Sequence, residues 1–81
     1  MKEDELWRRM LGVFRQAFDL DELVLTPATT AADVEGWDSV SNIALMVALE
    51  AEFGIRFNTG EMADLENVGQ LAERIAARHD G

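Results

Sequence analysis

The segment Ser39–Phe53, which reads SVSNIALMVALEAEF, constrains the fold more than any other part of the chain. As a helix it would be apolar around most of its circumference. Such a helix is either enclosed in a bundle or keeps a second face for a partner. A chain of 81 residues cannot easily enclose it on all sides. We therefore expect a central helix whose face near Val40, Ile43 and Val47 stays partly exposed. Asp38 or Ser39 suits its N-cap, and Gly54 suits its C-terminal end.

Two amphipathic segments flank this central one. The spacing of apolar residues predicts a first helix over Asp4 to Phe18 and a last helix that begins after Asn67 as an N-cap, with Gln70 in a capping-box position. Both have one apolar stripe, as expected for helices that pack against a shared core. The stripes consist of Leu6, Met10, Val13 and Ala17 in the first helix and Val68, Leu71, Ala72 and Ile75 in the last.

The segments between the helices lack a clear period. Asp19 to Trp37 contains the only proline and is long for a connection in a small domain, although a short turn over Asp21 to Leu25 is possible. Gly60 to Leu65 is predicted to form a short helical turn. We expect the long loop to be held down by its apolar residues, which are Leu23, Val24, Leu25 and Val34. The predicted fold is all-α: one domain over 1–81, a small bundle of three main helices plus one short helix.

Charge limits the partners of such a bundle. The net charge is −9, and Asp19 to Glu66 holds eleven acidic residues against a single base, Arg56. An acidic centre repels nucleic acid and anionic membrane surfaces, whereas it attracts basic protein surfaces. Charge that only keeps the protein soluble is the plainer alternative. The start MKEDELWRRM is too charged for a secretory signal, so we expect a cytoplasmic protein, and its high charge favours a monomer.

Few residues could carry catalysis or bind a metal. The chain has no cysteine, and its one histidine, His79, lies near the end, where an exposed helix-end position is the expected role. We interpret Glu50 and Glu52 as solvated charges, and Trp7 and Trp37 as packing anchors. No metal-binding pattern or glycine-rich phosphate loop is present. The sequence therefore predicts a protein that is not an enzyme.

One further residue stands out in the stretch GWDSVSNIALMVALEAEFGIRF. A serine at a helix start is usually a cap, but Ser39 is followed by an aliphatic run, by Leu49-Glu50 and by Glu52-Phe53-Gly54. This pattern resembles the prosthetic-group site of acyl carrier proteins and peptidyl carrier proteins. The approach TPATTAADVEGW resembles the long first loop of that family, and Asn67-Val68 resembles the start of its last helix, so the resemblance covers almost the whole chain.

The resemblance implies a function that composition alone does not indicate. In this family a phosphopantetheinyl transferase moves 4′-phosphopantetheine from coenzyme A onto the serine, here Ser39 preceded by Asp38, and the thiol of the arm holds acyl or aminoacyl groups as thioesters. Loading, condensing or tailoring enzymes with basic docking surfaces are the implied partners. Leu45, Met46, Leu49 and Phe53 would form the core. The implied partner face consists of Val40, Ile43, Ala44, Val47, Glu50 and Ala51.

The partner face departs from the pattern of fatty-acid synthesis. That pattern has acidic residues where this chain has Ala44 and Ala51. The difference favours a carrier dedicated to one specialised pathway, such as polyketide or nonribosomal peptide synthesis, over a carrier of primary fatty-acid synthesis. A more distant alternative is an acidic helical adaptor module in which Ser39 is only a cap.

Overall fold

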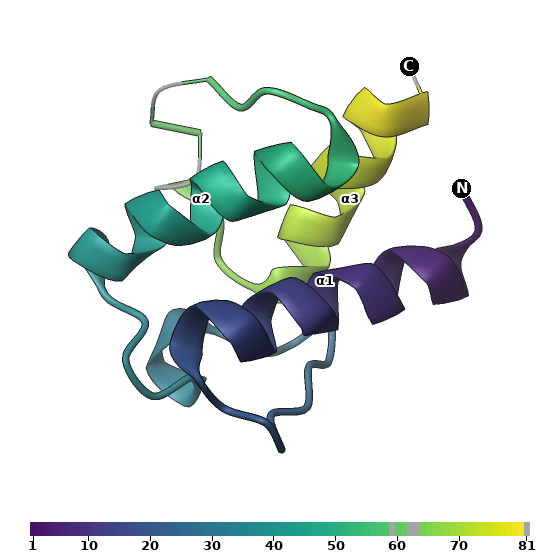
Figure 1. Cartoon of the computed structure of the whole chain (residues 1–81). Helices are drawn as coiled ribbons and strands as arrows, with labels where there is room; N and C mark the ends of the chain where they lie inside the picture. The colour runs from purple at the N-terminus through teal and green to yellow at the C-terminus, as the bar shows by residue number, and fades with distance from the viewer. Residues whose placement is uncertain (59, 62–63, 81) are drawn as a thin grey trace.

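A computed structural model describes residues 1–58, 60–61 and 64–80 of the protein. Within these residues the chain forms three α-helices (Figure 1). They are α1 (Glu3–Phe18), α2 (Ser39–Phe53) and α3 (Val68–Asp80), and a short 3-10 helix, η1 (Ala31–Asp33), lies in the first loop. The predicted all-α fold and the bounds of the first two helices are confirmed to within one residue. None of the helices in the described ranges is long and apolar enough to span a bilayer.

The core lies where the three helices meet. The expected stripe of α3 is fully buried, and α2 contributes Leu45, Leu49 and Phe53, while Met46 is half-buried at the edge of the core. In α1 the prediction was wrong at one position: Ala17 is exposed, and Phe14 is fully buried in its place. The reason is that the buried face of α1 turns toward Phe14, which packs against Trp37 from the long loop.

The loop between α1 and α2 is held to the helices by some of the predicted anchors. Val34 is buried, and Leu23 and Leu25 pack against the core. Val24 is 69% exposed, so its predicted role as an anchor was wrong. Adjacent residues of an extended chain point to opposite sides, so Val24 faces away when its two neighbours face the core.

Backbone hydrogen bonds fix the same loop to the start of α3. The N–H groups of Val68 and Gly69 donate to the carbonyl oxygens of Thr29 and Pro27, at 2.8 and 2.9 Å. The first N–H groups of a helix have no partner within the helix, so these loop carbonyls satisfy two of them. Asn67 caps α3, as the sequence predicted: its Oδ1 accepts a hydrogen bond from the Gln70 N–H at 2.9 Å.

Glu61, which lies between α2 and α3 in the chain, forms ion pairs with α3. Glu61 is largely buried and pairs with Arg74 and Arg78, and hydrogen bonds, above all from Arg78, hold the pKa of Glu61 below its usual value. The predicted short helix over Gly60 to Leu65 includes positions 62–63, which lie outside the described residues.

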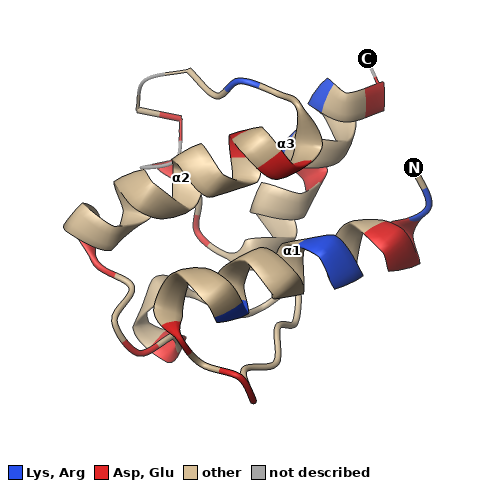
Figure 2. Cartoon of the chain, in the orientation of Figure 1, with Lys and Arg blue, Asp and Glu red and all other residues tan. Residues whose placement is uncertain are grey.

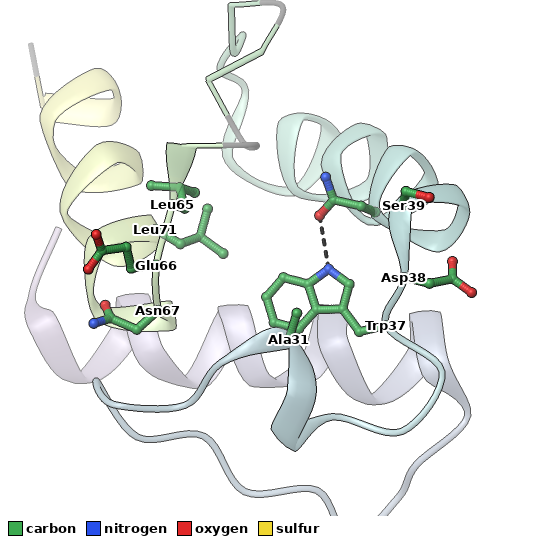
Figure 3. Close-up of a pocket in the computed structure, with 9 residues that line it drawn as sticks. Ala31, Trp37, Asp38, Ser39, Leu65, Glu66, Asn67 and Leu71 are labelled. Carbon is green, nitrogen blue, oxygen red and sulfur yellow. Dashed lines mark hydrogen bonds between the residues drawn. The ribbon is translucent and has the colours of Figure 1, made fainter.

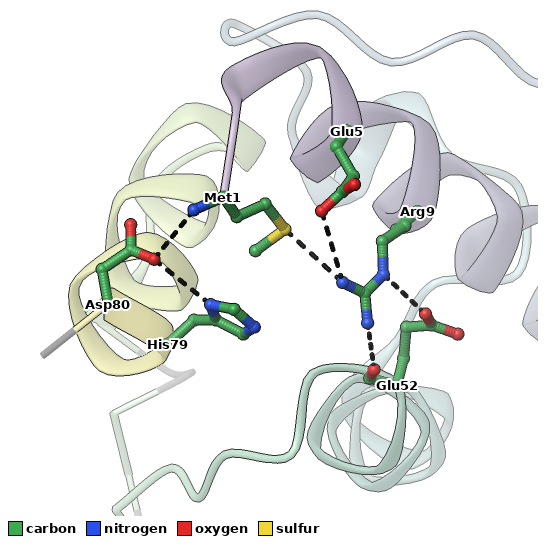
Figure 4. A network of polar contacts seen from close by, with 6 residues as sticks. All are labelled: Met1, Glu5, Arg9, Glu52, His79 and Asp80. Carbon is green, nitrogen blue, oxygen red and sulfur yellow. Dashed lines mark hydrogen bonds and ion pairs between the residues drawn. The ribbon is translucent and has the colours of Figure 1, made fainter.

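Contacts near the termini connect all three helices (Figure 4). Arg9 of α1 pairs with Glu52 of α2 at 2.8 Å and lies over the Phe53 ring, and the Met1 amino group pairs with Asp80 of α3 at 3.1 Å. Glu52 is therefore an ion-pair partner rather than a purely solvated charge. These contacts lie at one end of the bundle, whereas the N-terminus of α2 lies at the other (Figure 1).

Candidate functional site

Ser39 is the first residue of α2 and is exposed where the long loop meets the helix. The N-cap is Asp38, whose Oδ1 accepts from the N–H groups of Val40 and Ser41 at 3.0 and 2.8 Å. Ser41 Oγ accepts from the Asp38 N–H at 2.8 Å and donates to the Gly36 carbonyl at 2.7 Å. Within the described residues, Ser39 Oγ takes part in none of these hydrogen bonds. Asp38 and Ser41 form the cap of α2, and in the described part of the chain the Ser39 hydroxyl makes no hydrogen bond.

Sequence reasoning left the cap open between Asp38 and Ser39 and missed Ser41. A signal for Ser41 was present, because a polar residue three positions after an N-cap is the capping-box pattern, which usually has Glu or Gln there. Asp38 and Ser41 form this reciprocal pair in the structure. Helix capping therefore does not account for the serine between them.

The carboxylate of Asp38 dominates the electrostatics of this helix end. Hydrogen bonds, chiefly from the Ser41 N–H and also from the Val40 N–H, hold the pKa of Asp38 below its ordinary value, so it is ionised at neutral pH. Helix N-termini favour anions because their N–H groups are free. Here two of those groups are already bonded to Asp38, so the helix end offers a phosphate less stabilisation than its position alone would indicate.

The residues just before Asp38 are packed in place. Gly36 has a φ of 88°, a conformation that residues with a side chain rarely adopt, and this turn directs Trp37 toward α1. The Trp37 ring packs edge-on against Phe14, with centroids 5.2 Å apart, and also lies near Phe18. Its Nε1–H donates to Asn42 Oδ1 at 2.9 Å. Trp37 is a packing anchor, as the sequence predicted, and it links the loop to the first turn of α2.

A pocket of about 440 Å³ opens beside Ser39. Figure 3 shows the Trp37 ring on one side of it and Leu65 and Leu71 on the other. The pocket therefore lies between the long loop, α2 and the start of α3. Its lining residues are Ala31, Trp37, Asp38, Ser39, Asn42, Leu65, Glu66, Asn67 and Leu71.

The outer face of α2 begins next to Ser39. Val40, Ile43 and Val47 are 77%, 65% and 60% exposed, as expected for the face left open, and Ala44 and Ala51 are exposed with them. Figure 2 shows this helix without charge over most of its length, in a protein that is otherwise acidic. Large apolar side chains that stay exposed in a row often mark a contact surface for another protein.

Glu50 was expected both to be solvated and to belong to this face. Its Oε2 accepts from the Phe57 N–H at 2.8 Å, and the side chain is half-buried. The carboxylate is thus bound to the segment that follows α2. The interpretation of Glu50 as a free solvated charge was wrong, because the chain after Gly54 folds back over this turn of the helix.

Ser39 and His79 do not form a catalytic pair. His79 is exposed at the end of α3, where its Nδ1 lies 3.2 Å from Asp80 Oδ1. The C-terminal end of α3 and the N-terminal end of α2 lie at opposite ends of the bundle (Figure 1). A Ser-His arrangement needs the two side chains within hydrogen-bonding reach, and these two are not.

Comparison with known proteins identifies the kind of site. Residues 5–75 match the family model described as "Phosphopantetheine attachment site". Acyl carrier protein MbtL from Mycolicibacterium paratuberculosis is 33% identical over 93% of this chain and 84% of its own, and MbtL from Mycobacterium tuberculosis is 31% identical over 86% and 83%.

A solved structure agrees with these relatives. The solution structure of a holo acyl carrier protein from Geobacter metallireducens superposes with a TM-score of 0.82 at 42% identity, over 89% of this chain and 83% of that one. Proteins of this kind work with a phosphopantetheinyl transferase and with biosynthetic enzymes, and they are generally not catalysts themselves. The chain belongs to the acyl carrier protein family, and its cofactor is covalently attached 4′-phosphopantetheine.

Proposed function

We propose that this acyl carrier protein bears its arm on Ser39 and serves one dedicated pathway of specialised metabolism. The observation that carries the attachment site is the free hydroxyl: Asp38 and Ser41 do the capping, and exposed Ser39 Oγ is not used by them. The open pocket next to this serine also suits a long, partly apolar substituent. The arm supplies a thiol that holds the cargo as a thioester.

The attachment reaction transfers phosphopantetheine from coenzyme A to the Ser39 hydroxyl. Ser39 Oγ forms a bond to the phosphorus of the phosphopantetheine half, and the pyrophosphate bond of coenzyme A breaks. Adenosine 3′,5′-bisphosphate leaves, and the proton of the hydroxyl is released. The chain's part in this step is to present an exposed nucleophile on a rigid helix start, while the transferase supplies the catalysis.

Because the chain contains no cysteine, attachment of the arm can be tested through the thiol that it adds. Since the chain has no thiol of its own, the unmodified protein should not react with a thiol reagent. After incubation with coenzyme A, magnesium and a broad-specificity phosphopantetheinyl transferase, we expect one reactive thiol per chain and one added phosphopantetheine by mass. Folded protein that gains neither would overturn the attachment proposal and favour the adaptor module.

We further propose that partner enzymes bind the apolar face of α2, defined by Val40, Ile43, Ala44, Val47 and Ala51, with Asp38 at its head. The acidic surface elsewhere would speed encounter with basic partner surfaces, while the apolar face would supply the contact itself. Glu50 was part of the expected face, but its bond to the Phe57 N–H makes it a poor partner for an incoming cation.

The alanines at positions 44 and 51, in place of acidic residues, support a dedicated pathway. The alternative is that the protein is a carrier of primary fatty-acid synthesis. In that case the enzymes of fatty-acid synthesis should accept the holo protein as readily as they accept their own carrier. We propose that they accept it poorly, because Ala44 and Ala51 offer no charge to a basic docking site. Polyketide or nonribosomal peptide enzymes are the partners that we propose instead.

Replacing Val47 with glutamate should lower the kcat/KM of the loading enzyme for the holo protein by about tenfold or more. The reason is that the new carboxylate would be buried without a partner on docking, at a cost above about 1.4 kcal/mol. Val24→Glu is the matched control, since it adds the same charge at a residue that is 69% exposed in the long loop. Steady-state kinetics at varied carrier concentration would measure both, and equal losses would contradict the proposed face.

We also propose that residues 1–81 form one non-catalytic carrier domain, because α1, α2 and α3 share a single core. A cytoplasmic monomer fits the net charge of −9, which keeps copies of the chain apart.

A further inference from the structure

We propose that Arg56, just past the end of α2, binds a carboxylate of the loading enzyme, beside a hollow that receives an apolar side chain of the same enzyme. This inference deepens the proposed function and rests on the proposed docking face of α2. It adds a contact of the opposite sign, because the net charge of the chain by itself favours basic groups on a partner.

A hollow of about 460 Å³ continues the apolar face of α2 at the C-terminal end of the helix. Val47 and Ala51 belong to that face and also line the hollow, together with the buried residue Ile55. A Cβ atom at Gly54, the C-cap of α2, would meet nothing within 4 Å, so the space beside this turn is open. The hollow therefore has room for an apolar side chain of a protein that docks on the face. Its lining residues are Val47, Glu50, Ala51, Gly54, Ile55 and Arg56.

Arg56 is an uncompensated cation at the edge of this hollow. It is exposed, and in the described part of the chain its guanidinium makes no ion pair and no hydrogen bond. By contrast, Arg9, Arg74 and Arg78 are each paired with a carboxylate of the same chain. Arg56 is also the only base from Asp19 to Glu66. A carboxylate from another protein is the group that this position lacks, and a guanidinium binds carboxylates through two parallel hydrogen bonds.

The backbone on both sides of Arg56 is held in place without a partner. The Ile55 N–H donates to the Glu50 carbonyl oxygen at 3.2 Å, and the Phe57 N–H donates to Glu50 Oε2 at 2.8 Å. Glu50 also lines the hollow, but its carboxylate is bonded to that backbone N–H and forms no ion pair with Arg56 in the described residues. Because its attachment to α2 is fixed in advance, Arg56 loses less conformational freedom when a partner binds.

The docking face therefore carries charges of opposite sign at its two ends. Asp38 is the anion at its head, and Arg56 is the cation past its C-terminal end. Figure 2 shows a red segment at the start of α2 and a blue one in the chain that follows the helix. The helix between them has 15 residues and is about 22 Å long. A partner with a cation and a carboxylate at matching positions docks in one direction only, since the reverse direction brings like charges together. That direction fixes where Ser39 is presented to the enzyme.

Charge reversal at Arg56 tests the contact through the kinetics of loading. With the holo protein as substrate, Arg56→Glu should lower the kcat/KM of the loading enzyme by about tenfold or more, because it sets two carboxylates against each other. Arg8→Glu is the matched control, since it makes the same change of charge at an exposed residue of α1 outside the face. It should change kcat/KM by less than about twofold. Equal losses in the two variants would mean that only net charge matters and would overturn the proposal, as would an unchanged kcat/KM in Arg56→Glu.

Carbodiimide coupling tests for the carboxylate of the enzyme directly, because this reagent joins an amine to a carboxylate as an amide. Holo Arg56→Lys protein mixed with the loading enzyme should give a cross-linked peptide that contains position 56 and an aspartate or glutamate of the enzyme. Holo Arg8→Lys protein, treated in the same way, should give no such link from position 8. If position 56 gave no link, the proposal would be overturned.

Failures of the earlier proposals give different results. If the original protein gained no phosphopantetheine, the attachment at Ser39 would be overturned. If Val47→Glu left loading unchanged, the docking face on which this inference rests would be overturned. If loading depends on Val47 but not on Arg56, the face stands and the contact with a carboxylate is wrong.

Discussion

Ser39→Ala will gain no phosphopantetheine, whereas Ser41→Ala, two residues away, will still be modified. The two serines share a helix turn but differ in their hydrogen bonds. Ser39 Oγ is exposed and unused by the cap, while Ser41 Oγ bonds to the Asp38 N–H and the Gly36 carbonyl. Intact-protein mass after incubation with coenzyme A, magnesium and the transferase measures the expected loss, which is complete for Ser39→Ala.

The two substitutions should affect stability in the opposite order, with Ser41→Ala the more destabilising. Ser39→Ala removes no hydrogen bond that the structure records, so its free energy of unfolding should stay within about 0.5 kcal/mol of the original. Ser41→Ala loses the reciprocal cap and should cost about 1 kcal/mol. Chemical denaturation followed by circular dichroism would check this. If the Ser39→Ala variant still gained phosphopantetheine, or failed to fold, then attachment and capping would have been assigned to the wrong serines.

The helices could be predicted from the sequence because their signals are local. The stripe of α3, with Val68, Leu71 and Ile75, follows from spacing alone, and all three are buried. The exposed face of α2 followed from a mismatch between its apolar circumference and the small size of the chain. Both inferences need only periodicity and an estimate of how much surface 81 residues can cover.

The long loop could not be predicted in the same way. Its structure depends on contacts between residues far apart in the chain, such as Phe14 with Trp37, and these leave no periodic signal. Val24 and Leu25 are equally apolar in sequence, yet Val24 is exposed and Leu25 packs against the core. The bond between Glu50 and the Phe57 N–H likewise depends on how the chain turns after Gly54.

For the candidate site, the sequence located Ser39 through a family resemblance and not through physics. The structure adds the roles of the neighbouring residues. Asp38 and Ser41 cap α2, and Trp37 packs against Phe14, whereas Ser39 takes part in neither interaction. The pocket beside it was not predicted, because its walls come from three separate segments that meet only in the fold.

Alanine at Gly69 should destabilise the protein by about 2 kcal/mol, the largest stability loss that we predict for so small a change. A Cβ atom there would lie 2.8 Å from the Pro27 carbonyl oxygen and 3.1 Å from Pro27 Cβ. That oxygen cannot move away freely, because it accepts the hydrogen bond from the Gly69 N–H at 2.9 Å. Relieving the clash would thus also weaken a bond worth about 1 kcal/mol. Together these losses exceed the gain of about 1 kcal/mol that alanine brings to a helix.

Gly12→Ala supplies the comparison, because it makes the same substitution in α1 where a Cβ would meet nothing within 4 Å. Only the helix-propensity gain applies there, so this variant should be more stable by about 0.5–1 kcal/mol. Thermal unfolding at one pH would place the two midpoints on opposite sides of the original, with Gly69→Ala lower by on the order of 10 °C. A Gly69→Ala midpoint at or above the original would mean that the loop carbonyls of Pro27 and Thr29 do not hold the start of α3.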